Sequence, residues 1–296
     1  MERPAGSGIQ AAVFAVLTLI WGTTWAAIRI GLSGIPPMTG VSLRFAIAAA
    51  VLFLAAVPMG VRFGRSARER WLWIVNGLLS YVVSYGVVYW CEQWIPSGLA
   101  AVLFSTFTLF VALMAHVALP GERLGTMAAV GVLIGFVGIA VIYSEDLTAL
   151  GGAPVRRAAL IMLLSPLAAA IANVAVKRWG HGVHPLSLAA VPMGIGAGVM
   201  GALAIVAERG RPVVFDAVSV GALLYLAVFG SAVTFTLYYW LLAKMPASRL
   251  AMIAYLTPLT ALGFGAAFLG EPLQTRTLVG TPLVLAGIML ASRQRS

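Results

Sequence analysis

Long apolar runs, separated by short polar segments, extend through the whole chain. Each run is close to the roughly 20 residues that a helix needs to cross about 30 Å of hydrocarbon. Polar and apolar residues do not alternate within the runs, as they would in a strand of a membrane barrel. Backbone groups in lipid must also be hydrogen-bonded within the protein. The pattern therefore predicts an all-α polytopic membrane protein. Its ten transmembrane helices are expected at about residues 10–31, 38–58, 71–92, 98–119, 125–143, 158–178, 185–206, 218–242, 248–269 and 275–291.

The composition supports this interpretation. Hydrophobic residues make up 61% of the 296 residues and charged residues only 9%, against about a quarter charged in soluble proteins. The net charge of +10 would suggest nucleic acid as a partner of a soluble protein, but here Lys and Arg lie between the apolar runs, where they set orientation. We expect a lipid bilayer around the chain and no nucleic-acid partner. The first run ends without a small-x-small cleavage pattern, so we expect it to be retained.

The distribution of Lys and Arg predicts the orientation. Twelve of them fall on the side of the N-terminus, four of these between residues 62 and 70, and at most seven fall on the other side. The excess of positive charge belongs to the cytoplasmic loops of a membrane protein. Both termini are therefore expected in the cytoplasm.

The second half of the chain repeats landmarks of the first at an offset of 148 to 150 residues. Because each half holds five predicted spans, an odd number, the second half enters the membrane from the opposite face. Two inverted five-helix repeats are typical of secondary transporters; a duplication retained only for packing is the alternative. We expect repeats at 1–145 and 158–296, joined by an extracytoplasmic loop at 146–157. The matching landmarks include Arg29 with Lys177, Tyr89–Trp90 with Tyr239–Trp240, Pro96 with Pro246, and Gly121–Glu122 with Gly270–Glu271.

Three tyrosines, Tyr81, Tyr85 and Tyr89, recur every four residues in the third predicted span and so share one helix face. Lipid offers no hydrogen-bond partner for their hydroxyls. Two interpretations stay open: hydrogen bonds to neighbouring helices, or the wall of a wet cavity, for which tyrosine combines an apolar face with a polar tip. The equivalent positions in the eighth span are Ser231, Phe235 and Tyr239.

A second group of candidates lies in the fourth and ninth spans. Ser105 and Thr108 stand in FSTFTLF, and Tyr255, Thr257 and Pro258 stand in AYLTPLT. Pro258 removes a helical hydrogen bond and frees a carbonyl close to Thr257, and transporters expose backbone groups to substrate at such broken positions. The alternative is that these hydroxyls bond back to their own helices.

Charged residues are rare inside the predicted spans. All nine acidic residues fall at or beyond span ends. Arg44 and Lys177 are the candidates for buried cations, which would attract a substrate carboxylate or else extend to the membrane interface. Glu122 and Glu271 each follow one span and precede the next, which suits a helix N-terminal cap better than chemistry.

Three short motifs, ordered along the chain and partly duplicated, resemble those of the EamA family of the drug/metabolite transporter superfamily. They are WGTTW at Trp21–Trp25, PMTGVSLR at Pro37–Arg44, and the GE pairs at Gly121–Glu122 and Gly270–Glu271. Among members of the family, the chain is most similar to the ten-helix YddG-type exporters of amino acids and related metabolites.

The resemblance implies a bacterial inner-membrane protein with a central cavity lined by the first, third, fourth, sixth, eighth and ninth spans. Trp25 has no aromatic counterpart in the second half, where Asn173 takes its place, so the two sides of the cavity should differ chemically. The expected substrate-binding residues are Trp21, Trp25, Tyr81, Tyr85, Ser105, Thr108, Asn173, Phe235, Tyr239, Tyr255, Thr257 and Pro258.

The expected function is that of a secondary transporter, which exports small amphipathic metabolites, amino acids in particular, by alternating access. An intramembrane enzyme is the alternative from another class, but the chain has no HExxH, GxSxG or pair of mid-span aspartates, and Cys91 is its single cysteine. We therefore expect no catalytic residue, metal or cofactor. A lipid flippase or a membrane scaffold is a further alternative. GxxxG pairs at 131–135 and 194–198 would serve close packing, either within the bundle or across a homodimer.

Overall fold

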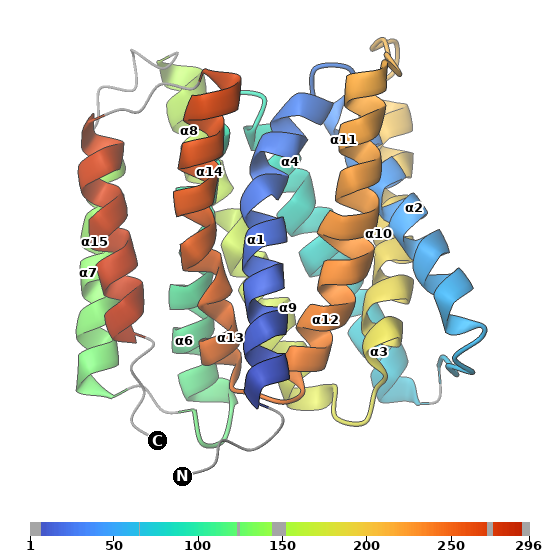
Figure 1. The fold of residues 1–296 in the computed structure, drawn as a ribbon, viewed down its shortest axis with the longest axis horizontal. Helices are drawn as coiled ribbons and strands as arrows, with labels where there is room; N and C mark the ends of the chain where they lie inside the picture. Colours follow the sequence, from blue (N-terminus) through green and yellow to red (C-terminus); the bar gives the residue numbers. More distant parts are fainter. Residues whose placement is uncertain (1–6, 65, 123–124, 144–151, 271–274, 292–296) are drawn as a thin grey trace.

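The computed structural model describes residues 7–64, 66–122, 125–143, 152–270 and 275–291 (Figure 1). Every regular element within these ranges is helical, and the helical share is 81%. Residues 146–151, half of the expected connecting loop at 146–157, lie outside the described residues, as does Glu271 of the second GE pair. The described part of the chain thus has the all-α architecture that the apolar pattern predicts.

The helices form a series of rods, several of which are broken or locally rewound. The rod expected at 158–178 begins earlier, at Ala153, within the interval expected to be a loop. In chain order the helices are α1 (Ser7–Gly31), α2 (Pro37–Ala56), α3 (Ala67–Asn76), η1 (Gly77–Ser84), α4 (Tyr85–Cys91), α5 (Ser97–Phe104), α6 (Phe107–Ala118), α7 (Thr126–Tyr143), α8 (Ala153–Met162), α9 (Leu164–Trp179), α10 (Pro185–Ala207), α11 (Ala217–Ala227), η2 (Val228–Val233), α12 (Thr234–Leu242), α13 (Ala247–Ala251), α14 (Ile253–Leu269) and α15 (Thr275–Ala291).

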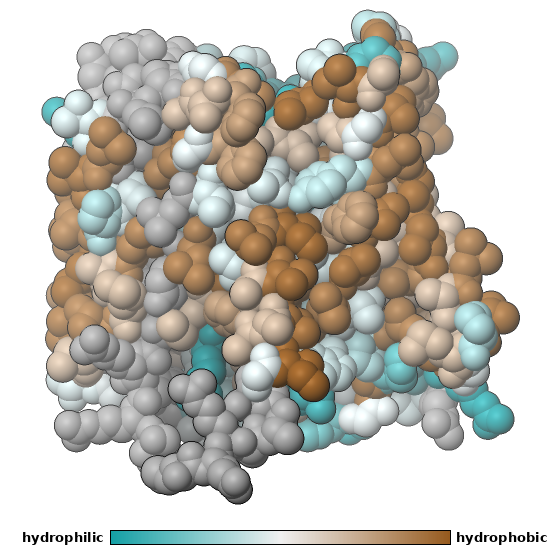
Figure 2. Space-filling model, in the orientation of Figure 1, coloured by the Kyte–Doolittle hydropathy of each residue, from teal (hydrophilic) through white to brown (hydrophobic). Residues whose placement is uncertain are grey.

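Eight rods in the described ranges are long and apolar enough to cross a membrane. They correspond to all the predicted spans except the fifth and the tenth, which are α7 and α15, with 18 and 17 residues. Figure 2 shows apolar side chains over most of the height of one face, with polar side chains gathered near its ends, as a lipid-facing surface requires. The chain is a multi-pass membrane protein, and its count of ten spans stays a prediction.

Helices at equivalent places in the two halves pack against each other. α2 packs along α10, α7 along α15, and α5 against α14. The first residue of α1 and the last residue of α15 lie at the same end of the bundle (Figure 1). The core therefore forms between the halves rather than within each of them.

The third and eighth rods contain π-helical segments at equivalent positions of the repeat, η1 and η2. A π-helix shifts the backbone hydrogen bonds from i+4 to i+5 and is frequent at functional sites. Gly230, in η2, has a carbonyl that accepts a hydrogen bond from Arg44 Nη2 at 3.0 Å. The apolar pattern alone does not reveal this rewinding.

Glycines bring α7 and α15 into close contact. A methyl group on Gly287 of α15 would collide with backbone atoms of Gly131 and Gly135 of α7, and Gly138 meets the backbone of α15 in the same way. Small residues at an interface let membrane helices approach closely. Packing within the bundle is therefore the role of the first GxxxG pair. The pair at 194–198 has open space beside both glycines, and a homodimer there stays a prediction.

Gly287→Ala is expected to destabilise the protein, because the added methyl group forces α7 and α15 apart, and such overpacking costs roughly 1–3 kcal/mol. Gly198→Ala is the matched control, since nothing lies within 4 Å of the added carbon. The midpoint of thermal unfolding in detergent should fall for Gly287→Ala, whereas Gly198→Ala should keep or raise it. Equal midpoints would contradict the close contact.

Buried carboxylates join the two halves at the ends of the bundle. α13 starts after Pro246 without a side-chain cap of its own, so its first N–H groups need another acceptor. The carboxylate of Glu122, which follows α6, accepts hydrogen bonds from the N–H groups of Ala247 and Ser248, at 3.0 and 3.2 Å. Glu122 therefore caps a helix N-terminus, as we predict, and the capped helix is α13 of the other half. Glu208 binds two N–H groups at the start of α2 in the same manner.

Candidate functional site

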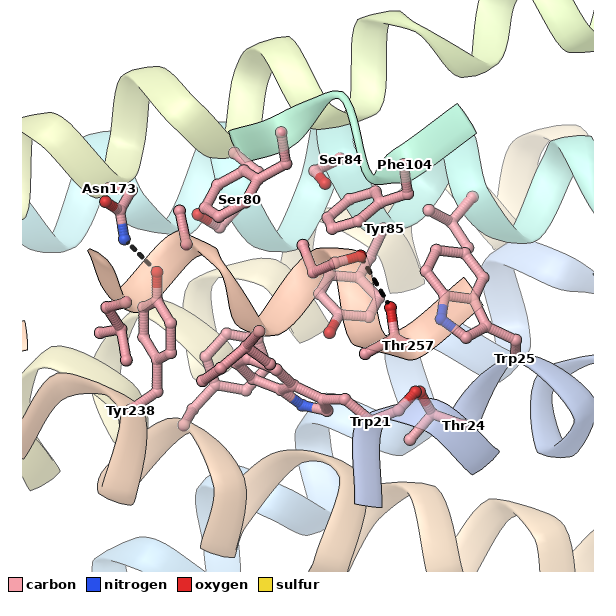
Figure 3. Close-up of a pocket in the computed structure, with 18 of the residues that line it drawn as sticks. Trp21, Thr24, Trp25, Ser80, Ser84, Tyr85, Phe104, Asn173, Tyr238 and Thr257 are labelled. Atoms are coloured by element: carbon pink, nitrogen blue, oxygen red, sulfur yellow. Dashed lines mark hydrogen bonds between the residues drawn. The ribbon is translucent and has the colours of Figure 1, made fainter. Parts of the chain in front are cut away.

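A cavity lies between helices of both halves in the middle of the bundle (Figure 3). Its volume is about 100 Å³, which is room for on the order of three water molecules at the roughly 30 Å³ that each occupies in the liquid. This size suits a small solute. Within the described ranges, six rods form its wall: α1; α3, η1 and α4; α5 and α6; α9; α12; and α13 and α14. These are the first, third, fourth, sixth, eighth and ninth predicted spans, which are also the spans that the resemblance implies.

The cavity wall is aromatic and uncharged. Hydroxyl and amide groups lie between the rings, and none of the described residues on the wall has a charged side chain. Ring faces with a few polar tips suit an amphipathic solute. The aromatic residues on the wall are Trp21, Trp25, Tyr85, Phe104, Phe107, Phe235, Tyr238 and Tyr239, and the other polar ones are Thr24, Asn76, Ser80, Ser84, Asn173 and Thr257.

The WGTTW motif supplies one side of the cavity. Trp21 and Trp25 lie four residues apart on α1 and so share one helix face. Trp21 Nε1 donates to Thr234 Oγ1 at 3.1 Å, and its ring lies 5.4 Å from that of Phe235. The ring of Trp25 lies 5.4 Å from that of Phe104. Aromatic neighbours therefore hold both indoles against the cavity.

Asn173 and Tyr238 lie at the end of the cavity opposite to Trp25, as Figure 3 shows. Asn173 Nδ2 donates to the Tyr238 hydroxyl. Asn173 Oδ1 is buried and has no hydrogen-bond partner among the described residues. A buried acceptor of this kind is costly unless a donor reaches it, so a solute or a water molecule with an N–H or O–H group would be favoured beside it.

A hydrogen-bonded network holds Tyr239 in the wall. Asn76 Nδ2 donates to the Tyr239 hydroxyl at 2.7 Å and to Leu188 O at 3.0 Å, and Ser80 Oγ donates to Asn76 Oδ1 at 2.9 Å. The hydroxyl of Tyr81 lies 3.3 Å from that of Tyr239. Tyr81 is fully buried behind the wall, so the structure supports interhelical bonding for this member of the tyrosine stripe.

The structure brings seven of the twelve predicted site residues together on one wall. The side chain of Tyr255 lies outside the described residues. That the seven bind substrate stays a prediction. They are Trp21, Trp25, Tyr85, Asn173, Phe235, Tyr239 and Thr257.

Ser105 and Thr108 do not lie on the wall, and their hydrogen bonds explain why. Ser105 Oγ donates to Val102 O of its own helix at 2.6 Å. Thr108 Oγ1 donates across the halves to Ala251 O, at the break between α13 and α14, at 2.7 Å. Both hydroxyls are used to satisfy backbone carbonyls.

Pro258 also lies off the wall, and it does not break its helix. α14 continues through it, and the break lies earlier, between Ala251 and Ile253. A proline leaves the carbonyl four residues before it without a helical partner. That carbonyl, on Ala254, accepts a hydrogen bond from the Thr257 hydroxyl at 3.1 Å (Figure 3). The backbone group that we expected to face substrate is therefore satisfied within α14.

Arg44 is fully buried and lies behind the cavity wall. Its Nε donates to Ser231 Oγ at 2.8 Å, and its guanidinium also binds the carbonyl of Gly230. The guanidinium carbon lies 4.7 Å from the ring centroid of Tyr85. Arg44 thus neither extends to the interface nor reaches the cavity. It stacks on the outer face of an aromatic ring whose side chain lines the cavity.

Lys177 lies off the central cavity as well. Its Nζ donates to the carbonyls of Leu242 and Met245, at 2.8 Å each, where α12 ends. It lines a second, smaller cavity of about 60 Å³. Tyr239 borders both cavities.

Sequence reasoning missed several polar residues of the wall. Asn76, Ser80 and Ser84 recur every four residues in an otherwise apolar span, so they share a helix face in the same way as the tyrosines. That spacing was the available signal. For Tyr238 no such signal exists, because only the tertiary structure brings its hydroxyl to Asn173.

The family model described as the EamA-like transporter family matches residues 7–144 and 156–293. The chain is 26% identical to the uncharacterized transporter YoaV of Bacillus subtilis, over 93% of each chain. It is 29% identical to the uncharacterized inner membrane transporter YedA of Escherichia coli, over 95% of this chain and 89% of that one. It is 30% identical to a probable terminal-alkyne amino-acid exporter of Streptantibioticus cattleyicolor, over 94% of this chain and 92% of that one.

A protein of known crystal structure shares the fold, with a TM-score of 0.73 at 19% sequence identity over 96% of both chains. The relatives are named as transporters and not as enzymes. Two matches of the same family model cover nearly the whole chain. On this evidence the chain belongs to the EamA-like transporter family.

Proposed function

We propose that the protein is a secondary transporter that exports small amphipathic metabolites, with amino acids as the first class, across the bacterial inner membrane. The observation that carries the proposal is the uncharged aromatic cavity between the two halves. Ring faces bind the apolar part of a solute, and the amide and hydroxyl groups orient its polar part. Asn173 Oδ1, buried without a partner among the described residues, suits an N–H donor such as an amino group.

The same arrangement supports alternating access as the mechanism of the proposed transport. Equivalent helices of the two halves pack against each other, and both halves carry a π-helical segment, of which η1 lines the cavity. We propose that these are two inverted repeats of five spans, 1–145 and 158–296, and that rocking between them opens the cavity to either side. The relative from Streptantibioticus cattleyicolor, named a probable amino-acid exporter, supports the substrate class.

Both termini should lie in the cytoplasm. Arg62, exposed after α2, and Ala153, exposed at the start of α8, should then lie on opposite faces. In a Cys91→Ala background, a membrane-impermeant maleimide should label Ala153→Cys on intact cells. Arg62→Cys should react only after permeabilisation. The reverse pattern would contradict the orientation, and labelling of both from one face would contradict the inverted repeats.

Transport of a panel of labelled amino acids in proteoliposomes tests the proposed function. Ala169→Trp fills the cavity from α9 and should abolish any transport. Ile171→Trp, at an exposed position of the same helix, should leave it unchanged. Chemical conversion of a panel member would favour the intramembrane enzyme, and movement of labelled lipid alone would favour the flippase. No movement of any solute or lipid would favour a scaffold.

A further inference from the structure

The second cavity opens at the end of the bundle where α9 and α12 end and α10 begins. We call it the vestibule, and define it by Lys177, Gly182, Val183, Leu188 and Tyr239. Gly182 is exposed and Val183 is half-buried, so solvent reaches the vestibule from this end. The charge distribution of the loops assigns this end to the cytoplasm.

The vestibule and the central cavity share one lining residue among those described. Tyr239 lines both cavities. Asn76, on the central cavity, donates hydrogen bonds both to the Tyr239 hydroxyl and to the carbonyl of Leu188, which lines the vestibule. A movement of the Tyr239 ring would therefore join the two spaces.

The two cavities differ in charge. Lys177 lies one helical turn after Asn173 on α9, so the two side chains follow one another on a single face. None of the described residues that line the vestibule is acidic. The carboxylate of Glu122 acts on Lys177 electrostatically, but its oxygens bind the start of α13. The direct partners of the ammonium group are neutral carbonyls, which leave its charge available to an anion.

A second cation approaches the rim of the vestibule. Arg68 Nη2 donates to the carbonyl of His181, which lines the vestibule, at 2.9 Å. A solute that enters from this end thus meets positive charge first, and the aromatic wall of the central cavity afterwards.

We propose that the vestibule is a second solute site, which holds the carboxylate of a small anionic or zwitterionic solute on Lys177 beside Tyr239. The proposal rests on the proposed transport function, because it makes the vestibule the place where a solute waits on the cytoplasmic side of the central cavity. The competing role for Lys177 is only to bind the last carbonyls of α12.

Reagents of opposite charge measure the field in the vestibule without transport. Val183→Cys is placed in the Cys91→Ala background and treated with sulfonatoethyl or trimethylammonioethyl methanethiosulfonate. Lys177→Gln should lower the ratio of the modification rate of the anionic reagent to that of the cationic reagent. A single charge acting in water over a chosen distance of about 8 Å would change this ratio about fivefold. Lys177→Arg keeps the charge and should keep the ratio. Lys244→Gln, an exposed lysine that lies over Trp240, is the matched control and should also keep it.

Propionate tests the carboxylate itself on a protein that retains Lys177. With neutral methyl methanethiosulfonate, propionate should slow the modification of Val183→Cys, whereas chloride at equal ionic strength should not. Lys177→Gln should remove this protection. An unchanged rate ratio in Lys177→Gln, or no protection by propionate, would overturn the proposal. A protein that is protected by propionate but moves no solute in proteoliposomes would keep the vestibule site and end the proposed function.

Discussion

Tyr85→Ala is expected to lower transport by roughly tenfold or more, whereas Tyr85→Phe should retain most of it. The Tyr85 ring is part of the cavity wall. Its other face lies under the guanidinium of Arg44 at 4.7 Å, and the ring of Phe45 meets it edge-on at 5.0 Å. Alanine removes the ring from both contacts and exposes a buried cation to the cavity. Phenylalanine keeps the ring and loses only the hydroxyl.

The two variants are compared by their initial rates of transport in proteoliposomes, normalised to the amount of folded protein. Tyr225→Ala is the matched control, because Tyr225 is a tyrosine of α11 that contacts α1 through Thr23 but does not line the central cavity. Its transport should stay close to that of the unmodified protein. If Tyr85→Ala transports as well as Tyr85→Phe, the ring serves packing only, and the solute is bound elsewhere.

Glu122→Ala is expected to destabilise the protein by roughly 2–4 kcal/mol, because it leaves buried N–H groups without an acceptor. Ala247 is fully buried and Ser248 is 4% exposed, so water does not readily replace the carboxylate. Ser248 Oγ also donates to Glu122, at 2.8 Å. Because α13 carries Leu250 of the cavity wall, transport should fall together with stability.

Thermal unfolding in detergent and solute transport are the two measurements. Ser248→Ala removes one hydroxyl bond of this group and should cost only about 1 kcal/mol. Glu122→Gln keeps one acceptor oxygen and should lie between the two. An unfolding midpoint of Glu122→Ala equal to that of the unmodified protein would show that the cross-half cap does not hold α13.

Spacing along one helix predicts which side chains share a face, and two candidate site residues illustrate this. Trp21 and Trp25 lie on one face because they are four residues apart, and both line the cavity. Tyr81 and Tyr85 also lie four residues apart, but only Tyr85 lines the cavity. Helix periodicity gives a common face but not the position of its edge, and Tyr81 lies behind the wall.

The errors came from hydrogen-bond partners that are distant in the chain. Thr108 binds a carbonyl of the second half, so its hydroxyl is not available to a solute. Pro258 does free a carbonyl, but Thr257 of the same helix satisfies it. The π-helical segments depend in part on such partners as well, since Arg44 of α2 binds a carbonyl within η2.

The sequence by itself determined the helical membrane architecture, the repeat and the aromatic character of α1, because these depend on composition and on spacing along one helix. Only the tertiary structure decided which helix each carboxylate caps, which tyrosine faces the cavity, and where the two cations lie. These features depend on distances between the halves, as when Glu122 reaches α13 and Arg44 reaches η2. Such distances are set by helix packing, and the order of residues along a single helix does not contain them.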